Sequence, residues 1–311
     1  MSSEVSAEGK VFVIAGKNIN DINFINAWNG CREEAEKYGD TCMHIGEPDH
    51  PHFRIQDSVI SRVLEKPIQG IAVSVTNSEY LAQNSLREAY DKNIPVVTFD
   101  SDLDLEHQYL RKGYIGPDNL EFGRALAREA QRYQPEGGNI CLMSGAVFDP
   151  NLNKRILGVR RELSGNENLD RDQKLDGQNG WKEPVRCPWY NWDNYETSLQ
   201  QMWEAIYRAE IDVFVSVGAW PVTNPELYMD VISPARQLFL ESKEKTIIVG
   251  IGTPTEDQMS LLQKQYLHAY VIIDFTEMGR LVYHRLKSLS EGGDIPEWTR
   301  TSNRVLRWDD Y

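Results

Sequence analysis

The feature that most constrains the fold is an alternation of short apolar runs with amphipathic stretches, which occurs in two series along the chain. In the first series the pattern predicts strands at 10–15, 41–45, 70–75 and 95–99 and helices at 24–38, 55–65 and 79–92. β-branched residues bounded by glycine or proline are typical of strands, and apolar residues three or four apart are typical of helices. Strands that alternate with helices predict a parallel sheet covered on both faces.

The second series has the same layout. It predicts strands at 139–143, 185–189, 213–217, 246–251 and 269–273 and helices at 120–133, 153–163, 195–209 and 256–265. The intervening segment 166–182 is polar and lacks an apolar period, so we expect it to be a surface excursion. Because 311 residues exceed the size of one usual core, two series predict two lobes.

Composition excludes several classes of protein. The chain has 41% hydrophobic residues, enough for packed cores, but no apolar run long enough to span a membrane. Its net charge of −14, with no cluster of Lys or Arg, disfavours nucleic acid as a partner. Residues 1–9 lack the basic start and apolar core of a signal peptide. We expect a disordered or recombinant tail that replaces a removed export signal, the alternative being a cytoplasmic protein.

No catalytic motif, cofactor motif or metal motif stands out. The chain has no Gly-x-Ser-x-Gly elbow, phosphate loop, dinucleotide-binding glycine pattern or His-Glu-x-x-His. His44, His50 and His52 lie near one loop, but its polar, turn-rich sequence favours solvated histidines over a metal site. Asp21 and Asp100 are the one visible candidate for an acid–base pair, which keeps an enzyme on the same fold as an alternative. We therefore expect no enzyme, no cofactor and no metal.

The four cysteines do not have the spacing of a metal site. Cys31 is predicted on the first helix and Cys42 on the following strand, while Cys141 and Cys187 are predicted on two successive strands of the second series. Each pair could therefore come within bridging distance, and buried free thiols remain the alternative.

Ligands of open parallel sheets bind beyond the carboxyl ends of the strands. The loops expected to carry a ligand site are therefore those that follow residues 15, 75, 99, 143, 189, 217 and 251. If two such sheets face each other, these loops line one cleft.

Six segments together resemble a known family. They are GIAVSVTNSE at 70–79, NIPVVTFDS at 93–101, YIGPDN at 114–119 with Gly123, IDVFV at 211–215, IIVG at 247–250 and EMG at 277–279. In order and spacing they are similar to the type I periplasmic sugar-binding proteins typified by ribose-binding protein, whose fold is shared by the ligand domain of lactose-repressor-type regulators. The resemblance runs from about Lys10 to Leu289. No helix-turn-helix precedes Lys10, so the DNA-binding branch is not expected.

The resemblance implies two doubly wound α/β lobes joined by a three-crossover hinge. The N-terminal lobe would comprise residues 10–116 and 274–299, and the C-terminal lobe residues 117–273 and 300–311.

In the first lobe the resemblance implies ligand contacts from five residues. Where the family has Asn-Pro-Phe-Phe before a helix, this chain has Asp21, Asn23 and Phe24, so one aromatic is kept. Asp100 and Ser101 stand at the family's Asp-Arg pair and keep its carboxylate, which can accept from two ligand hydroxyls. The alternatives are a helix cap for Asp21, solvent exposure for Asn23 and a turn for Asp100.

The resemblance implies five more contacts: four in the second lobe and one, Asp274, at the start of the last segment of the first lobe. Asn153 and Arg155 bracket the position of the family's arginine, and Trp192 matches its cleft aromatic. Where the family has Gln-Asn-Asp, this chain has SVGAW at 216–220, so Trp220 replaces polar groups; Asp274 lies beside the position of a lost glutamine. A surface ion pair is the alternative for Arg155.

The implied function is that of a periplasmic solute-binding protein, which closes over a small sugar or sugar-like ligand by a hinge motion. It would present the ligand to a membrane permease or a sensor histidine kinase. Each lost hydroxyl-binding group would cost about 1–3 kcal/mol. The alternative ligands are therefore a furanosyl autoinducer or a methylated amine held by cation–π contact.

Overall fold

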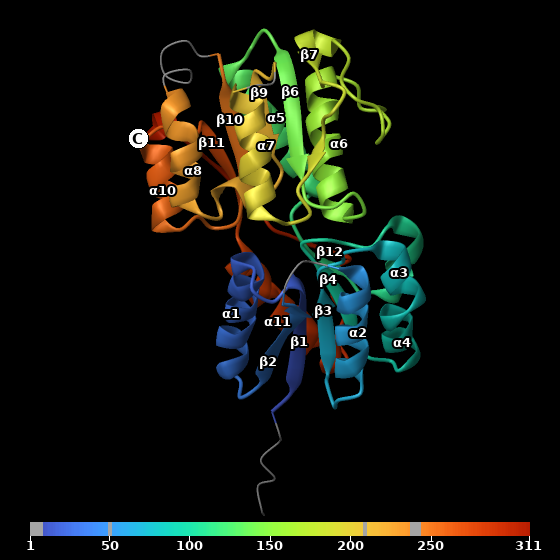
Figure 1. Ribbon diagram of the computed structural model, residues 1–311. Coiled ribbons are helices and arrows are strands. Elements are labelled where there is room, and N and C mark those ends of the chain that lie inside the picture. Colours follow the sequence, from blue (N-terminus) through green and yellow to red (C-terminus); the bar gives the residue numbers. More distant parts are fainter. Residues whose placement is uncertain (1–8, 49–51, 208–209, 237–243) are drawn as a thin grey trace, which may run out of the picture. The chain divides into compact units, whose positions relative to one another are not determined.

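The computed structural model describes residues 9–48, 52–207, 210–236 and 244–311. The chain divides into two compact units, and both are discontinuous in sequence (Figure 1). Unit 1 comprises Met1–Gly116 and Phe275–Thr301, and unit 2 comprises Pro117–Asp274 and Ser302–Tyr311. The chain therefore passes between the units three times, and the predicted two-lobed α/β architecture is confirmed. The tail predicted at residues 1–9 lies, up to residue 8, outside the described residues.

Unit 1 is built on a six-stranded sheet in the order β12-β5-β4-β3-β1-β2. Its strands are β1 (Val11–Asn18), β2 (Thr41–Glu47), β3 (Gly70–Val73), β4 (Val96–Phe99), β5 (Tyr114–Gly116) and β12 (Trp298–Arg300). Every pairing is parallel, and in register Val13 lies opposite both Met43 and Ile71. All carboxyl ends therefore meet at one edge of the sheet, as the alternating pattern predicts.

Helices cover both faces of this sheet (Figure 1). One face carries α1 (Ile22–Glu36) and α11 (Phe275–Ser290); the other carries α2 (Phe53–Leu64), α3 (Ser78–Gln83) and α4 (Ser85–Asp91), followed by the 3₁₀ helix η1 (Leu105–Leu110). The single helix predicted at 79–92 is wrong, because the backbone leaves helical geometry at Asn84 (φ −125°, ψ −107°). The apolar faces of α2, α3 and α4 pack on Val13, Ile71 and Val73.

Glycines allow α1 and α11 to cross closely. A Cβ atom on Gly279 would lie 1.8 Å from the carbonyl oxygen of Ala27, and one on Gly30 would lie 2.1 Å from that of Thr276. These helices thus touch backbone to backbone, which only residues without a side chain permit.

Unit 2 is built on a seven-stranded sheet whose main path is β13-β11-β10-β9-β6-β7, with β8 also paired to β6. Its strands are β6 (Gly138–Ser144), β7 (Trp181–Lys182), β8 (Trp189–Tyr190), β9 (Val213–Ser216), β10 (Thr246–Ile251), β11 (Ala269–Ile273) and β13 (Asn303–Arg307). All pairings are parallel except that of β13 with β11. The strand predicted at 185–189 is wrong except for its last residue, because Pro184 and Pro188 have no N–H for a ladder.

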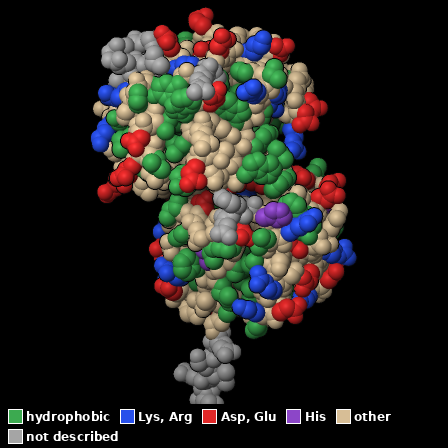
Figure 2. All heavy atoms as spheres, viewed as in Figure 1, with side chains coloured by type: hydrophobic (Ala, Val, Ile, Leu, Met, Phe, Trp, Pro, Cys, Tyr) green, Lys and Arg blue, Asp and Glu red, His purple; other side chains and the backbone are tan. Residues whose placement is uncertain are grey.

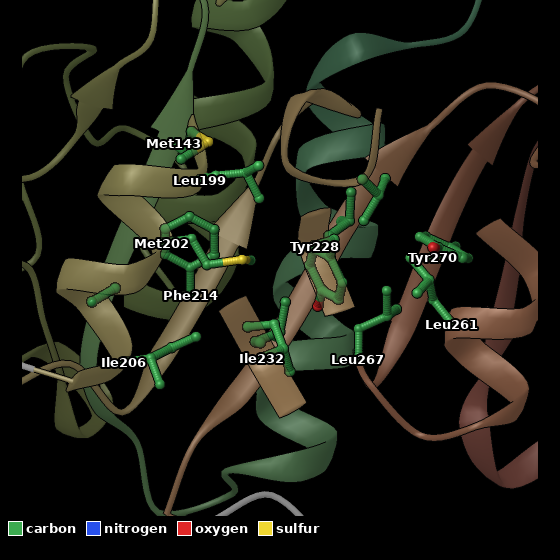
Figure 3. Packing of buried hydrophobic residues seen from close by; sticks show 14 of the residues in the cluster. Met143, Leu199, Met202, Ile206, Phe214, Tyr228, Ile232, Leu261, Leu267 and Tyr270 are labelled. Atoms are coloured by element: carbon green, nitrogen blue, oxygen red, sulfur yellow. The ribbon is translucent and has the colours of Figure 1, made fainter. Parts of the chain in front are cut away.

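The helices of unit 2 form two layers. α5 (Asn119–Tyr133) and α6 (Pro150–Ser164) pack against each other, while α7 (Tyr195–Tyr207), α8 (Pro225–Ile232) and α10 (Glu256–Gln263) cover the opposite face. Short 3₁₀ turns lie at η2 (Gln178–Gly180), η3 (Trp220–Val222), η4 (Ser233–Ala235) and η5 (Trp308–Asp310). Figure 3 shows the core under α7, α8 and α10, where Met202, Phe214, Tyr228 and Tyr270 are buried.

Both cysteine pairs form disulfides. Cys31 on α1 is bonded to Cys42 on β2, and Cys141 on β6 is bonded to Cys187 in the loop before β8. The Cα–Cα separations are 6.0 and 5.3 Å. The alternative of buried free thiols is therefore wrong.

The structure agrees with what the composition predicts about membrane-spanning segments and surface charge. None of the helices in the described part of the chain combines the length and apolarity that crossing a membrane requires. On the face drawn in Figure 2, acidic and basic side chains are interspersed.

Candidate functional site

Asp100 lies at the carboxyl edge of the unit 1 sheet, directly after β4. The residue is 3% exposed and has a left-handed backbone (φ 57°). The Ser74 hydroxyl donates to its Oδ2 at 3.1 Å, and the Tyr114 hydroxyl donates to its backbone oxygen at 2.9 Å. Asp adopts a left-handed backbone more readily than most residues, and these two contacts fix the carboxylate in that conformation.

Ser101 joins two loops of the same edge. Its hydroxyl donates to the Val75 carbonyl at 2.7 Å, and the Val75 N–H donates to the Ser101 carbonyl at 3.1 Å. The Ser101 hydroxyl therefore ties the loop after β3 to the loop after β4.

A buried ion pair, which the sequence did not reveal, braces the segment behind Asp100. Arg111 donates from Nε and Nη2 to the two carboxylate oxygens of Asp102, at 2.7 and 2.8 Å. The Asp102 carboxylate also accepts from the Thr98 hydroxyl and the Leu103 N–H. The signal in the sequence was weak, because an Asp and an Arg nine residues apart in a loop also fit a solvated surface.

Asp21 and Phe24 lie at the start of α1. The Asp21 carboxylate caps the helix by accepting from the Asn23 N–H at 2.7 Å, as its alternative predicted. Phe24 is buried, and its ring lies edge-on to Phe99 and Phe275 with centroids 6.1 and 6.0 Å away. Asn23 is half-buried at the second position of the helix.

Gln56 is a second buried polar group that sequence reasoning missed in unit 1. From α2, its Nε2 donates to the carbonyls of Gly16 and Ser74, at 3.2 and 2.8 Å. Its Oε1 accepts from the Thr76 hydroxyl at 2.6 Å. Gln56 thus links β1 to the loop after β3.

In unit 2, the Arg155 side chain is 5% exposed and binds within the unit. Its Nε donates to Asn119 Oδ1 at 2.8 Å, its Nη1 donates to the Val217 carbonyl at 3.0 Å, and its guanidinium lies 4.6 Å from the Phe122 ring centroid. A surface ion pair, the alternative for this residue, is therefore wrong. Asn153 donates to the Val147 carbonyl at 2.9 Å and so holds the loop before α6.

Trp192 projects from the loop after β8. The residue is 54% exposed, and both it and Asp193 have left-handed backbones, with φ of 54° and 58°. Asp193 Oδ1 accepts from the indole N–H of Trp220 at 2.7 Å, and the Trp192 N–H donates to Gly145 at 3.2 Å. Trp192 and Trp220 were both predicted at the site. They are connected through the carboxylate of Asp193, which was not among the predicted site residues.

Ser144 and Asn191 form a further polar pair that sequence reasoning missed. The Asn191 N–H donates to the Ser144 carbonyl at 2.9 Å, and Asn191 Oδ1 accepts from the Asp193 N–H at 2.9 Å. Within the described residues, Ser144 Oγ and Asn191 Nδ2 are buried and have no hydrogen-bond partner. A polar YNWD sequence directly after a strand was the available signal for this pair.

The predicted site residues fall into two sets, each at the carboxyl ends of strands in its own unit. Unit 1 carries Asp21, Asn23, Phe24, Asp100 and Ser101, and unit 2 carries Asn153, Arg155, Trp192, Trp220 and Asp274. Asp274 is exposed and follows β11 directly. It is the last residue of the longer of the two segments that make up unit 2.

The histidines considered for a metal have other surroundings. Burial lowers the pKa of His44 to about 4, and its ring stacks on Trp28 with centroids 5.7 Å apart. His52 caps α2 by accepting from the Arg54 N–H at 3.2 Å, and His50 lies outside the described residues. In the portion of the chain that the structure covers, no group of three His, Cys, Asp or Glu side chains is arranged to hold a metal ion.

Residues 12–294 match the model of the periplasmic binding protein domain. The chain belongs to this family. No curated protein matches the sequence.

Several solved structures resemble this periplasmic binding protein over its whole length. A glucose-galactose binding protein from Geobacillus stearothermophilus has 18% identity and a TM-score of 0.79, covering 97% of this chain and 99% of its own. A solute-binding protein of an ABC transporter from Agrobacterium vitis, with bound D-fucose, has 16% identity and a TM-score of 0.80, covering 96% and 95%. A solute-binding protein from Burkholderia graminis, in complex with D-arabinose, has 18% identity and a TM-score of 0.77, covering 98% and 97%. At these identities the likeness establishes the type I fold.

Proposed function

We propose that this periplasmic binding protein binds a sugar, or a small sugar-like solute, outside the cytoplasm and delivers it to an ABC transporter in the membrane. Family membership and the bound D-fucose and D-arabinose of the structural neighbours support a sugar ligand. The fold positions polar and aromatic side chains at the carboxyl ends of its strands, where ligands of such sheets bind.

The single observation that carries the proposal is the braced, left-handed backbone at Asp100 and Trp192. Three non-glycine residues at the two carboxyl edges, Asp100, Trp192 and Asp193, adopt left-handed conformations. Left-handed conformations of non-glycine residues collect at ligand sites, where they aim a side chain. A carboxylate accepts hydrogen bonds from two hydroxyls, and an indole face packs on the C–H groups of a sugar ring.

The mechanism that follows is binding without chemistry. Residues of both units would contact the ligand, and the bound form would favour a closed arrangement of the hinge. A membrane permease would then recognise that form. We propose no catalytic role for Asp21 and Asp100, because Asp21 caps α1 and Asp100 is fixed by Ser74.

The experiment that tests the function is a calorimetric and thermal-shift titration with D-fucose, D-arabinose, D-tagatose, D-galactose and D-glucose. A sugar present at a hundredfold excess over its Kd should stabilise the protein by about 2.7 kcal/mol. Loss of a charge-assisted hydrogen bond in Asp100→Asn should weaken binding about 10- to 100-fold, and Trp192→Ala should weaken it comparably.

Matched controls separate the site from general effects. Asp230→Asn on α8 and Trp203→Ala on α7 change the same residue types at exposed positions elsewhere in unit 2, so sugar affinity should be unchanged. The sugar should also be recovered chemically intact after long incubation. If no sugar shifts the melting temperature, or if Asp100→Asn and Trp192→Ala both bind as tightly as the parent, the proposal is wrong.

A further inference from the structure

Unit 2 has an irregular edge at β6. Strands β7 and β8 both pair with β6, β7 at Gly138 and Asn139 near its start and β8 at Met143 and Ser144 near its end. The connecting residues 183–188 leave the ladder, and the disulfide from Cys187 to Cys141 ties them back to the middle of β6. The loop at this edge of the sheet is therefore held at both ends by strand pairing with β6 and between those ends by the disulfide.

A cavity of about 650 Å³ lies at this loop. Its lining includes Asn139 at the start of β6 and Ile211 just before β9, so it extends to the amino-terminal side of the sheet. None of the ten residues expected to contact the sugar lines it. Its volume is within the range of about 300–1,000 Å³ that is usual for small-molecule sites.

The cavity has an apolar wall. Val185, Trp189, Ile211 and the disulfide-bonded Cys187 all line it. Val185 is 93% exposed, which is costly for an aliphatic side chain in water and which a bound apolar group would relieve. Figure 2 shows patches of hydrophobic side chains on the surface of this unit around α7.

Three of the charged side chains that line the cavity, Glu183, Asp176 and Lys182, already have a partner of opposite charge. Glu183 is buried and accepts from Arg160 Nε and Nη2 at 2.7 and 2.9 Å. Asp176 lies 3.9 Å from the ammonium of Lys182.

The remaining charges favour a cation. Glu204 on α7 and Glu210 before β9 line the cavity together with Arg186, and no ion pair is formed by any of the three with the described residues. Two carboxylates against one guanidinium leave a negative balance among the residues that line the cavity; the ammonium of Lys174, which donates to the Val185 carbonyl at 2.9 Å, lies beside this lining. An anionic ligand would be repelled by this balance.

We propose that this cavity is a second ligand site of unit 2, separate from the sugar site, for a flat apolar molecule that carries one ammonium group. The apolar body packs against Val185, Trp189 and Ile211, and the ammonium lies at Glu204 and Glu210. Aromatic contact with Trp189 adds attraction for the cation.

The test uses three probes that share an indole body and differ in charge: tryptamine, tryptophol and indole-3-acetate. Calorimetry at low ionic strength should give tryptamine a Kd up to about fivefold below that of neutral tryptophol, because an exposed ion pair contributes at most about 1 kcal/mol. Indole-3-acetate should bind most weakly.

Variants locate the site. Glu204→Gln combined with Glu210→Gln should reduce the affinity for tryptamine to that for tryptophol, while the matched control Glu226→Gln on α8 leaves it unchanged. Val185→Ser should weaken tryptamine and tryptophol alike. All four positions are exposed or half-buried, so these variants should fold.

The proposal is overturned if tryptamine shows no binding at about 10 mM, well above the Kd of about 1 mM that corresponds to −4.1 kcal/mol. It is also overturned if the double variant binds tryptamine as the parent does, or if indole-3-acetate binds best. Sugar binding by the same variants should stay at the parent level. Loss of the sugar response in the parent, with the tryptamine response intact, contradicts the proposed function alone.

Discussion

Acid should destabilise unit 2 through His268, which lies just before β11. The residue is 2% exposed, and its Nδ1 accepts from the Ile247 N–H at 3.1 Å. Its ring packs on Trp308 and Tyr133, with centroids 3.9 and 4.8 Å away. Burial lowers the pKa of His268 from 6.5 to about 3, although the nearby Asp309 carboxylate opposes this shift. The folded protein therefore holds the imidazole neutral.

The sign and size of the effect follow from the two pKa values. Between pH 6.5 and about 3 the unfolded chain binds a proton at His268 and the folded chain does not, so the free energy of unfolding falls as the pH falls. Above the unfolded pKa the contribution is constant. Each pH unit in this window costs about 1.4 kcal/mol, so acidification from about pH 7 to about pH 4.5 should cost about 2.5 kcal/mol from this residue.

The assay is urea unfolding, followed by tryptophan fluorescence, at a series of pH values in the parent and in His268→Asn. Asn keeps an acceptor for the Ile247 N–H but does not titrate. This variant should be less stable than the parent at neutral pH, because ring packing is lost, and should lose about 2.5 kcal/mol less on acidification. Leu267→Ala, which removes buried volume next to the histidine, should keep the parental pH dependence. Parallel pH profiles for the parent and His268→Asn would refute the reasoning.

Two further predictions concern helix packing and the disulfides. Gly279→Ala places a Cβ 1.8 Å from the Ala27 carbonyl oxygen. Although alanine has the higher helix propensity, urea unfolding should show a free energy of unfolding that is lower by about 1–3 kcal/mol. A gain in stability would contradict the close crossing of the two helices. Replacing Cys141 and Cys187 together by alanine should cost up to about 4 kcal/mol, because the bond closes a loop with a sequence separation of 46; an unchanged melting temperature would show that the loop is held by other contacts.

The sequence predicted the strands and helices correctly wherever one spacing of apolar residues, that of a strand or that of a helix, dominated a segment. The runs at 213–217 and 246–251 correspond to β9 and β10, since buried β-branched runs between turn residues have few other structures open to them. It failed at 185–188, where a run that began with Val185 contained a proline and became a loop; only Trp189 lies in a strand, β8. Local pattern does not disclose that Val185 lies in solvent, because that depends on the disulfide and on the strands that bracket the loop.

The sequence indicated which types of residue lie at the carboxyl ends of the strands better than it indicated what each residue binds. Asp100 and Trp192 follow strands in a recognisable sequence, and the structure places them in braced, left-handed conformations. Arg155 matched the family's arginine only approximately, and its guanidinium binds Asn119 and the Val217 carbonyl. The direction of a long side chain depends on partners far along the chain, which a single sequence does not identify.

The three passages of the chain between the units determine the order in which the units can be completed during synthesis. Unit 1 has five of its six strands within the first 116 residues, yet helix α11 and strand β12 are translated only after nearly all of unit 2. Until Tyr283 and its neighbours emerge from the ribosome, the face of the sheet that carries Phe12 has no α11 to cover it. Unit 2 needs only the edge strand β13 from the last residues. The first 116 residues of unit 1 therefore wait without α11 over part of this face, a state that a chaperone can recognise.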